Sequence, residues 1–133
     1  MSAVQNSYFY GVGRRKRSSA RTKYFPSTEA LDVQINKKAL AKYFPDYYAK
    51  VITEALKNLG INTGIINVFV KGGGLTGQAE ATRLSISKSL IKFSEDLKPL
   101  AKSFKYLTSD NRKVLPKRPG LRKARKREQW SKR

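Results

Sequence analysis

Two glycine segments carry the residue types that most often approach phosphate groups. The first, Gly72-Gly73-Gly74, lies in the stretch 71–78 (KGGGLTGQ), between a predicted strand and a predicted helix, where backbone N–H groups and the helix dipole favour phosphate. A Walker loop needs Gly-Lys-Ser/Thr after four variable residues, and Gln78 and Ala79 stand there instead. NTP hydrolysis is therefore disfavoured. Two interpretations remain: a steric turn, or bare backbone that lets an RNA sugar-phosphate chain approach closely.

Cations and polar donors next to both glycine segments favour the RNA interpretation, because such groups contact phosphates and 2′-hydroxyls. The second segment, 11–16 (GVGRRK), lacks the third glycine of a dinucleotide fingerprint and is better interpreted as a turn whose cations follow a phosphate ridge. A basic hairpin without a ligand is the alternative. The RNA-binding residues predicted in this part of the chain are Gly13, Arg14, Arg15, Lys16, Arg17, Arg21, Lys71, Gly72, Gly73, Gly74, Gln78 and Arg83.

The composition indicates a polyanionic partner and excludes most enzyme chemistry. The 133 residues include 29 Lys and Arg against 9 Asp and Glu, a net charge of +20, which a compact domain normally keeps only when a polyanion neutralises it. Cys and His are absent, which removes disulfides, thiolates and imidazole ligands. We predict no catalytic residue, no metal site and no cofactor. The most apolar stretch, 65–70, is too short to span a membrane, which indicates a soluble protein of a reducing compartment.

Half of the charge lies in the last 23 residues. Residues 111–133 hold 11 basic residues and one acid, with few apolar side chains and two prolines, so this segment cannot offset its ordering entropy. We predict a folded domain over 1–110 and an extended tail over 111–133 that is disordered without RNA. A charge run is usually only solvated, but an Arg-rich run of nearly one sign favours phosphate. The predicted RNA contacts of the tail are Arg112, Lys117, Arg118, Arg122, Lys123, Arg125, Lys126 and Arg127. Trp130 could stack on a base or pack on a neighbouring protein.

The elements that must position these residues are typical of an α/β (α+β) domain. Alternating apolar residues predict strands over 8–12, 19–25 and 31–35, joined as an antiparallel meander with a turn at 26–28. A short helix capped by Asn36, a longer one capped by Asp46 and ended by Gly60, a buried strand over 65–70 and a helix through 79–93 complete the expected order. Leu97, Leu100 and Phe104 are expected to continue as another helix after an interruption at Pro99.

The chain resembles the bacterial type of the universal family of small-subunit ribosomal protein nine. The resemblance rests on residues spread over almost the whole chain, and the glycine motif with the terminal Ser-Lys-Arg is specific in combination. The matching stretches are 10–16 (YGVGRRK), 19–21, 35–36, 43–44, 72–79 (GGGLTGQA), Arg83, 120–125 (GLRKAR) and 129–133 (QWSKR).

This resemblance implies a domain like the second domain of ribosomal protein S five, docked on rRNA of the small-subunit head. It also implies a tail that threads through RNA to the anticodon stem-loop of the peptidyl-site tRNA, with Ser131, Lys132 and Arg133 as tRNA contacts. Other ribosomal proteins of the head would be neighbours, no membrane would be involved, and the location would be a ribosome of the cytoplasm or of a plastid.

Departures from the family pattern fall in the helix and before the tail. Ser85 replaces a usual glycine, and its added volume argues against tight packing of the helix there. Ser109 replaces a usual arginine, so that contact does not carry over, and Leu115-Pro116 replaces a charged pair. Trp130 replaces a usual phenylalanine and keeps an aromatic ring.

The sequence thus predicts a structural RNA-binding protein of the small ribosomal subunit that acts by electrostatic tethering. Two other classes of protein are the alternatives. A free architectural nucleic-acid-binding protein would use the same charge. A phosphotransfer enzyme would need a Walker lysine and a pair of carboxylates to hold Mg²⁺, and this sequence offers neither.

Overall fold

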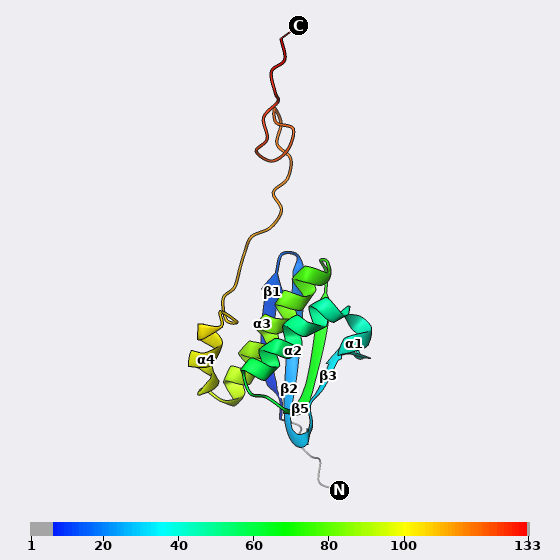
Figure 1. Ribbon diagram of the computed structural model, residues 1–133, viewed down its shortest axis with the longest axis vertical. Coiled ribbons are helices and arrows are strands. Elements are labelled where there is room, and N and C mark those ends of the chain that lie inside the picture. Colours follow the sequence, from blue (N-terminus) through cyan, green and yellow to red (C-terminus); the bar gives the residue numbers. More distant parts are fainter. Residues whose placement is uncertain (1–6, 133) are drawn as a thin grey trace.

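A five-stranded mixed sheet carries the helices on one of its faces (Figure 1). The computed structural model describes residues 7–132 of the chain. Along the sequence the elements are β1 (Phe9–Arg15), β2 (Ser18–Ala30), β3 (Asp32–Ile35), β4 (Lys38–Ala39), α1 (Leu40–Tyr43), α2 (Asp46–Asn58), β5 (Thr63–Lys71), α3 (Leu75–Phe93) and α4 (Leu97–Ser103). The mixed α+β class expected from the sequence is confirmed. None of the helices in 7–132 is long and apolar enough to cross a membrane.

The strand order β1-β2-β5-β3-β4 corrects the predicted meander. β1 and β2 form an antiparallel hairpin, but β3 pairs with β5 in parallel and does not touch β2. The reason is the helical crossover through α2, since parallel neighbours need a long connection of this kind. β5 is the most apolar strand, and it takes the central position between β2 and β3.

The segment predicted as a turn at 26–28 lies inside β2 instead. The ladder between β2 and β5 shifts register between Phe25 and Ala30. Pro26 has no N–H to donate, so a strand can carry it only where the ladder is interrupted. The proline therefore produces an irregularity in a long strand and does not end it.

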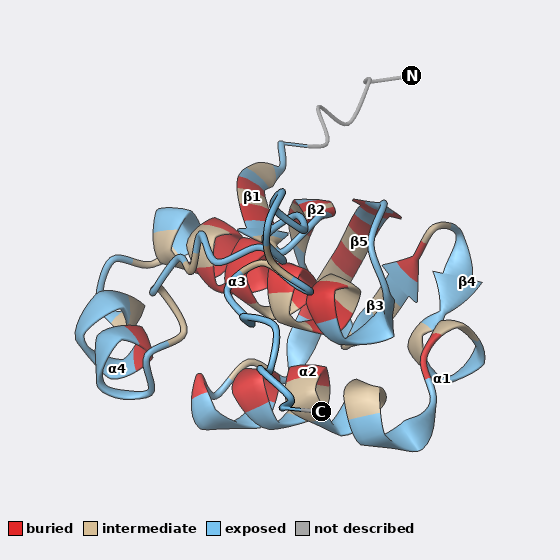
Figure 2. Cartoon of the chain, turned by 90° about the horizontal axis from the view of Figure 1, so that it is seen from above, coloured by how far each residue is buried: buried red, intermediate tan, exposed pale blue. Residues whose placement is uncertain are grey.

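The core lies between the sheet and the helices α2 and α3 (Figure 2). Ala20, Thr22 and Tyr24 are buried on one face of β2, which confirms the alternation predicted for this strand. Every second residue of β5 from 64 to 70 is buried in the same way. The opposite face of the sheet has no helix over it (Figure 2).

Two predicted helix caps are wrong. Asn36 has φ 49° and Lys37 has φ 65°, so both belong to the tight turn between β3 and β4, where two positive φ angles are needed and Asn is well tolerated. α1 starts only at Leu40. Asp46 is the first residue of α2 and makes no capping hydrogen bond, because Pro45 occupies the cap position. The prediction for Gly60 is confirmed, since it follows the end of α2 with φ 70°.

α3 packs tightly on β1 because two glycines of the strand leave room for it. A Cβ atom on Gly11 would lie 2.2 Å from the Ser85 carbonyl oxygen, and one on Gly13 would lie 2.2 Å from the Ala81 carbonyl oxygen. Ser85 does not loosen this packing, contrary to the expectation from its added volume. Its buried hydroxyl lies 2.7 Å from the Thr22 hydroxyl and donates to the Thr82 carbonyl at 2.9 Å.

We expect Gly13→Ala to lower the free energy of unfolding by about 1–3 kcal/mol, because the new methyl group meets helix backbone that cannot move aside. Urea denaturation of the purified protein measures this. Gly74→Ala is the matched control, since a Cβ there meets nothing within 4 Å and φ is −103°. Equal stability of the two variants would contradict the packing argument.

Candidate nucleic-acid interface

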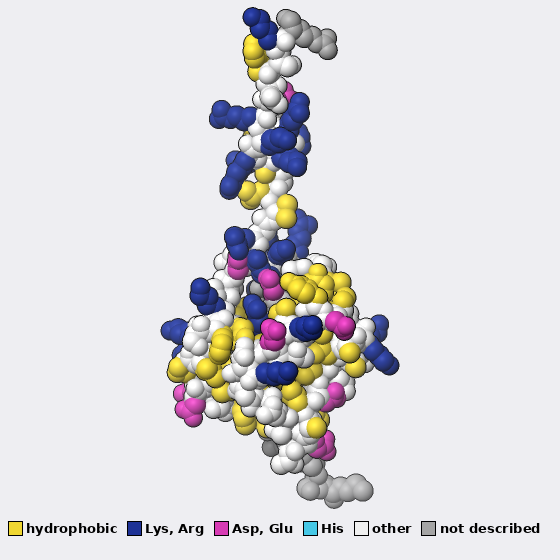
Figure 3. Space-filling model, in the orientation of Figure 1, with side chains coloured by type: hydrophobic (Ala, Val, Ile, Leu, Met, Phe, Trp, Pro, Cys, Tyr) yellow, Lys and Arg dark blue, Asp and Glu magenta, His cyan; other side chains and the backbone are white. Residues whose placement is uncertain are grey.

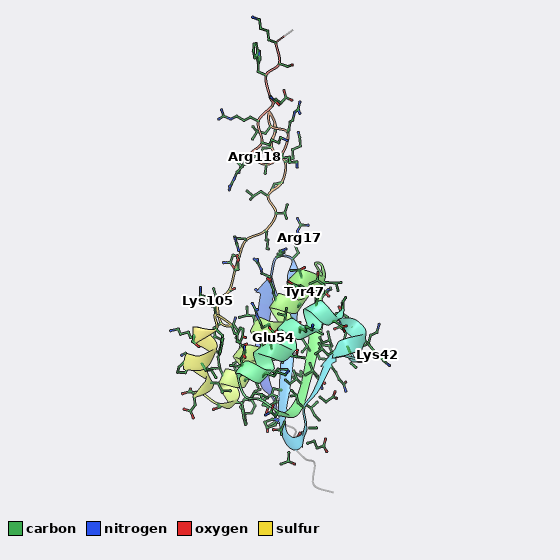
Figure 4. All side chains as sticks on the ribbon, in the orientation of Figure 1. Arg17, Lys42, Tyr47, Glu54, Lys105 and Arg118 are labelled. Atoms are coloured by element: carbon green, nitrogen blue, oxygen red, sulfur yellow. The ribbon has the colours of Figure 1, made fainter. Side chains whose placement is uncertain are left out.

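The tip of the β1–β2 hairpin presents consecutive cations to solvent. β1 ends at Arg15 and β2 begins at Ser18, so Lys16 and Arg17 form the turn. Lys16 has φ 54°, a conformation that non-glycine residues rarely adopt. Arg14, Lys16 and Arg17 are exposed, and Figure 4 shows Arg17 at the tip, on the side toward which the tail leaves. Within residues 7–132 none of these three forms a salt bridge.

The glycine loop between β5 and α3 packs against this hairpin. Gly72 and Gly73 have φ values of 78° and 66°. A Cβ on Gly72 would lie 2.8 Å from the Arg17 carbonyl oxygen, and one on Gly73 would lie 2.0 Å from the Ser18 hydroxyl. The steric interpretation therefore accounts for these two glycines. Gly74 differs, because its surroundings are open and it forms the N-cap of α3.

Four polar side chains hold the glycine loop in place. The Ser18 hydroxyl and the Gln78 amide donate to the Gly72 carbonyl at 2.9 and 3.1 Å. The Tyr43 hydroxyl donates to the Gln78 Oε1 at 2.9 Å. Asn36 bonds both the N–H and the carbonyl of Val70, at 2.9 and 3.0 Å. Gln78 was predicted as an RNA contact, and in the structure its side chain fixes the loop.

Sequence reasoning missed Ser18, Asn36 and Tyr43 as supports of this loop. Asn36 and Tyr43 stand in two of the stretches that carry the family resemblance, so a signal was present, but their partners lie 34 and 35 positions away. The N-terminus of α3 follows directly, with no side-chain cap. Its first internal backbone bond runs from the Gln78 N–H to the Gly74 carbonyl. The N–H groups of its first turn therefore point out beside the hairpin cations.

Arg15 makes internal ion pairs, unlike its exposed neighbours. Its side chain is only 18% exposed and pairs with the Glu80 carboxylate through Nε and with Asp110 through Nη1, the latter at 2.9 Å. Arg15 and Asp110 also form a parallel backbone bridge. We therefore assign Arg15 a structural role in place of the predicted phosphate contact. Gly13, also predicted as a contact, is buried under α3 and offers no surface to RNA.

Asp110 anchors the start of the tail to the hairpin. Besides Arg15, it accepts from the Arg112 backbone N–H at 2.9 Å and pairs with the Arg112 Nη2 at 2.7 Å. The hydrogen bonds from Arg112, helped by the charges of Arg112 and Arg15, lower the pKa of Asp110 to about 2. The carboxylate is thus ionised throughout the neutral range. Arg112, a predicted RNA contact, is partly neutralised by it but remains exposed.

The tip of the hairpin and the start of the tail, residues 110–113, together line a cationic hollow of about 510 Å³. Arg14, Lys16, Arg17 and Lys113 line it, and Asp110 is its acidic member, already paired with two arginines. A second hollow of about 230 Å³ shares Arg14, Arg15 and Asp110 with the first, and its other charged lining residues are Glu80, Arg83 and Lys105. The Arg83 guanidinium lies 5.3 Å from the centre of the Tyr106 ring. Charged groups arranged in this way suit phosphate oxygens.

The tail, residues 111–132, contains no helix or strand and runs away from the domain (Figure 1). Its cations project along its length on several sides (Figure 3), and Figure 4 marks Arg118 among them. Among the described residues of the tail, Arg112 alone forms a salt bridge. Trp130 is 79% exposed. Ser131 and Lys132 are exposed near the end, and the predicted contact Arg133 lies outside the described residues. The other predicted tail contacts are all exposed: Lys117, Arg118, Arg122, Lys123, Arg125, Lys126 and Arg127.

The remaining predicted contacts, Arg21 and Lys71, lie on the uncovered face of the sheet, opposite Phe69 and Ser19 respectively, and Ser19 also lines the hollow. Within residues 7–132 there is no group of three or more acidic, His or Cys residues that could hold a metal ion.

Residues 13–133 match the sequence family described as Ribosomal protein S9/S16. The match includes the turn of the hairpin, the glycine loop and the tail.

Proposed function

The chain belongs to the ribosomal protein S9/S16 family and is a structural protein of the ribosome, and we propose that it joins rRNA of the small-subunit head to tRNA in the peptidyl site. The family is of a structural, non-enzymatic kind that binds rRNA and other ribosomal proteins. In this proposal the cationic hollow binds rRNA and the tail reaches the tRNA.

One observation carries the proposal: the β1–β2 hairpin, the glycine loop and the start of the tail lie together at one end of the domain. Exposed cations from the hairpin and from Lys113 line one hollow, and the uncapped N-terminus of α3 lies beside the hairpin. Neutralising several phosphates in one place releases their counterions and supplies sequence-independent affinity. The domain would thus be fixed on rRNA at the point where the tail begins.

The tail supports the tRNA half of the proposal by its length and charge. Its 22 described residues could span on the order of 70 Å when fully extended. Lys and Arg contacts to phosphate position a partner without reading its sequence. This suits a site that accepts every elongator tRNA.

Cosedimentation tests the rRNA half. After a high-salt wash, the wild-type protein should stay with small ribosomal subunits. Release into a free pool bound to DNA would instead indicate an architectural nucleic-acid-binding protein and would overturn the proposal.

Deletion of residues 131–133 tests the tRNA half. We expect the truncated protein to fold and assemble normally, while tRNA affinity at the peptidyl site falls. The salt dependence of log K should also weaken by just under one unit for each cation lost. Filter binding of tRNA to purified subunits measures both quantities. Unchanged affinity together with an unchanged salt slope would refute the tRNA contact.

A further inference from the structure

The sheet has an uncovered face on which aromatic rings and cations alternate. All four helices lie on the other side (Figure 2), and alternate residues of β1, β2 and β5 point away from them. We call this surface the open face. The residues that define it are Tyr10, Val12 and Arg14 of β1, Arg21 and Lys23 of β2, and Asn67, Phe69 and Lys71 of β5.

Phe69 is an unusual residue for its position. It lies in β5, the central strand of the sheet, between the buried residues Val68 and Val70, yet it is 40% exposed. Tyr10, one strand beyond β2, is 37% exposed. Exposed rings on an uncovered sheet face favour a partner that covers them.

The registers place a cation beside each of these rings. Arg21 stands opposite Phe69 on one side and Val12 on the other. Lys23 stands between Tyr10 and Asn67, and its ammonium lies 4.7 Å from the centre of the Tyr8 ring. Rings and positive charges are thus interleaved over three neighbouring strands.

No carboxylate neutralises these cations within the part of the chain that the structure describes. Arg21, Lys23 and Lys71 form no salt bridge there. Asp32 stands in β3 opposite Ile65, and its carboxylate accepts a hydrogen bond from Gln34 at 2.8 Å. The open face therefore carries a net positive charge around its aromatic rings.

We propose that the open face binds a single-stranded segment of rRNA, whose bases stack on Phe69 and Tyr10 while Arg21 and Lys23 contact its phosphates. Aromatic side chains take unstacked bases, and cations follow the backbone, on sheet surfaces that bind single-stranded RNA. A base-paired helix does not fit, because its bases are already stacked on one another. Protein interfaces are depleted of lysine, whereas Lys23 lies in the middle strand of this face, between Tyr10 and Asn67. The proposal rests on the rRNA role proposed above and adds a second surface, which meets the cationic hollow at Arg14.

Photo-crosslinking in reconstituted small subunits tests the proposal directly. Ultraviolet irradiation joins a base to an aromatic ring that it stacks on, and mass spectrometry identifies the joined residue. We expect RNA adducts on Phe69 and Tyr10. Tyr47 provides the internal control, because it is 73% exposed on α2 and lies on the helix side of the sheet.

Affinity measurements test the energetic role of the ring. Phe69→Leu keeps an apolar side chain but removes the stacking surface, and its affinity for small-subunit particles depleted of this protein should fall roughly 5-fold or more. Phe69→Tyr should restore most of the binding. Tyr47→Leu is the matched control for ring loss. Arg21→Gln should also weaken binding, because it removes a proposed phosphate contact, and Lys50→Gln on α2 is its matched control. Urea denaturation checks that each variant is folded.

The outcomes separate this inference from the proposed function. Normal incorporation without adducts on Phe69 or Tyr10, and with Phe69→Leu binding as tightly as Tyr47→Leu, would overturn the inference and leave the proposed function standing. Chemical crosslinks from the open face to a neighbouring protein in place of RNA would also overturn it. Failure of the wild-type protein to enter small subunits would overturn both.

Discussion

Replacing Arg15 by glutamate should lower the free energy of unfolding by about 2 kcal/mol or more, whereas Arg14→Glu should leave stability nearly unchanged and weaken RNA binding. Arg15 lies between Glu80 and Asp110 with 18% of its side chain exposed. A glutamate there removes both ion pairs and brings three carboxylates together, and loss of one partner of a desolvated charge pair typically costs ~2–5 kcal/mol. Arg14 is exposed and lines the cationic hollow. Urea denaturation and RNA filter binding measure the two effects.

Arg17→Glu is the matched control for the stability effect of Arg15→Glu, because Arg17 is exposed at the hairpin tip. It should behave like Arg14→Glu, with normal stability and weaker RNA binding. If Arg15→Glu unfolds at the same urea concentration as these two, the ion pairs do not stabilise the hairpin and the tail start. If Arg14→Glu binds RNA as the wild type does, the hollow is not an RNA site.

The difference between Arg14 and Arg15 could not be predicted from the sequence. The two residues are neighbours in one run of cations. Alternation along a strand would place their side chains on opposite faces of the sheet, but only if the strand were known to continue to Arg15. The sequence predicted a strand ending at Val12, whereas β1 extends to Arg15. The partners that neutralise Arg15 are 65 and 95 positions away, at Glu80 and Asp110. Such long-range pairs leave no periodic signal.

Elements with a strong local period were predicted well. The alternation of Ala20, Thr22 and Tyr24 marked the buried face of β2, and Gly60 marked the end of α2. The pairing of β3 was predicted wrongly, because alternation says which face of a strand is buried but not which strand lies beside it. The parallel pairing of β3 with β5 follows from the crossover through α2, which is a property of the whole fold.

The glycine loop shows how the site depends on contacts that are distant in sequence. Its triple glycine left a steric turn and an RNA-facing backbone as alternatives, and the neighbouring cations and polar donors favoured the second. In the structure the three glycines have different roles. Gly72 and Gly73 make room for the hairpin, whereas Gly74 has open space around it. Only the packing of the loop on Arg17 and Ser18 separates these roles.

Neutralising five cations of the tail should produce the largest change in RNA binding. The substituted residues are Arg122, Lys123, Arg125, Lys126 and Arg127, each replaced by Gln. If all five contact phosphate, the slope of log K against log salt should decrease in magnitude by roughly 3.5–4.5 units, at ~0.7–0.9 per contact. Stability should not change, because these residues are exposed and form no salt bridge among the described residues. Binding to small-subunit rRNA over a salt series measures the slope.

The matched control removes five charges from the folded domain instead. Lys37, Lys38, Lys42, Lys50 and Lys57 are exposed around α1 and α2, away from the hairpin and tail (Figure 4 marks Lys42). Their replacement by Gln lowers the net charge by the same amount, so any effect of total charge alone should be equal in the two variants. A slope that falls only in the tail variant would show that the tail cations contact phosphate. Equal falls would mean that the tail contributes only its share of a diffuse positive charge, and the tethering role proposed for it would be wrong.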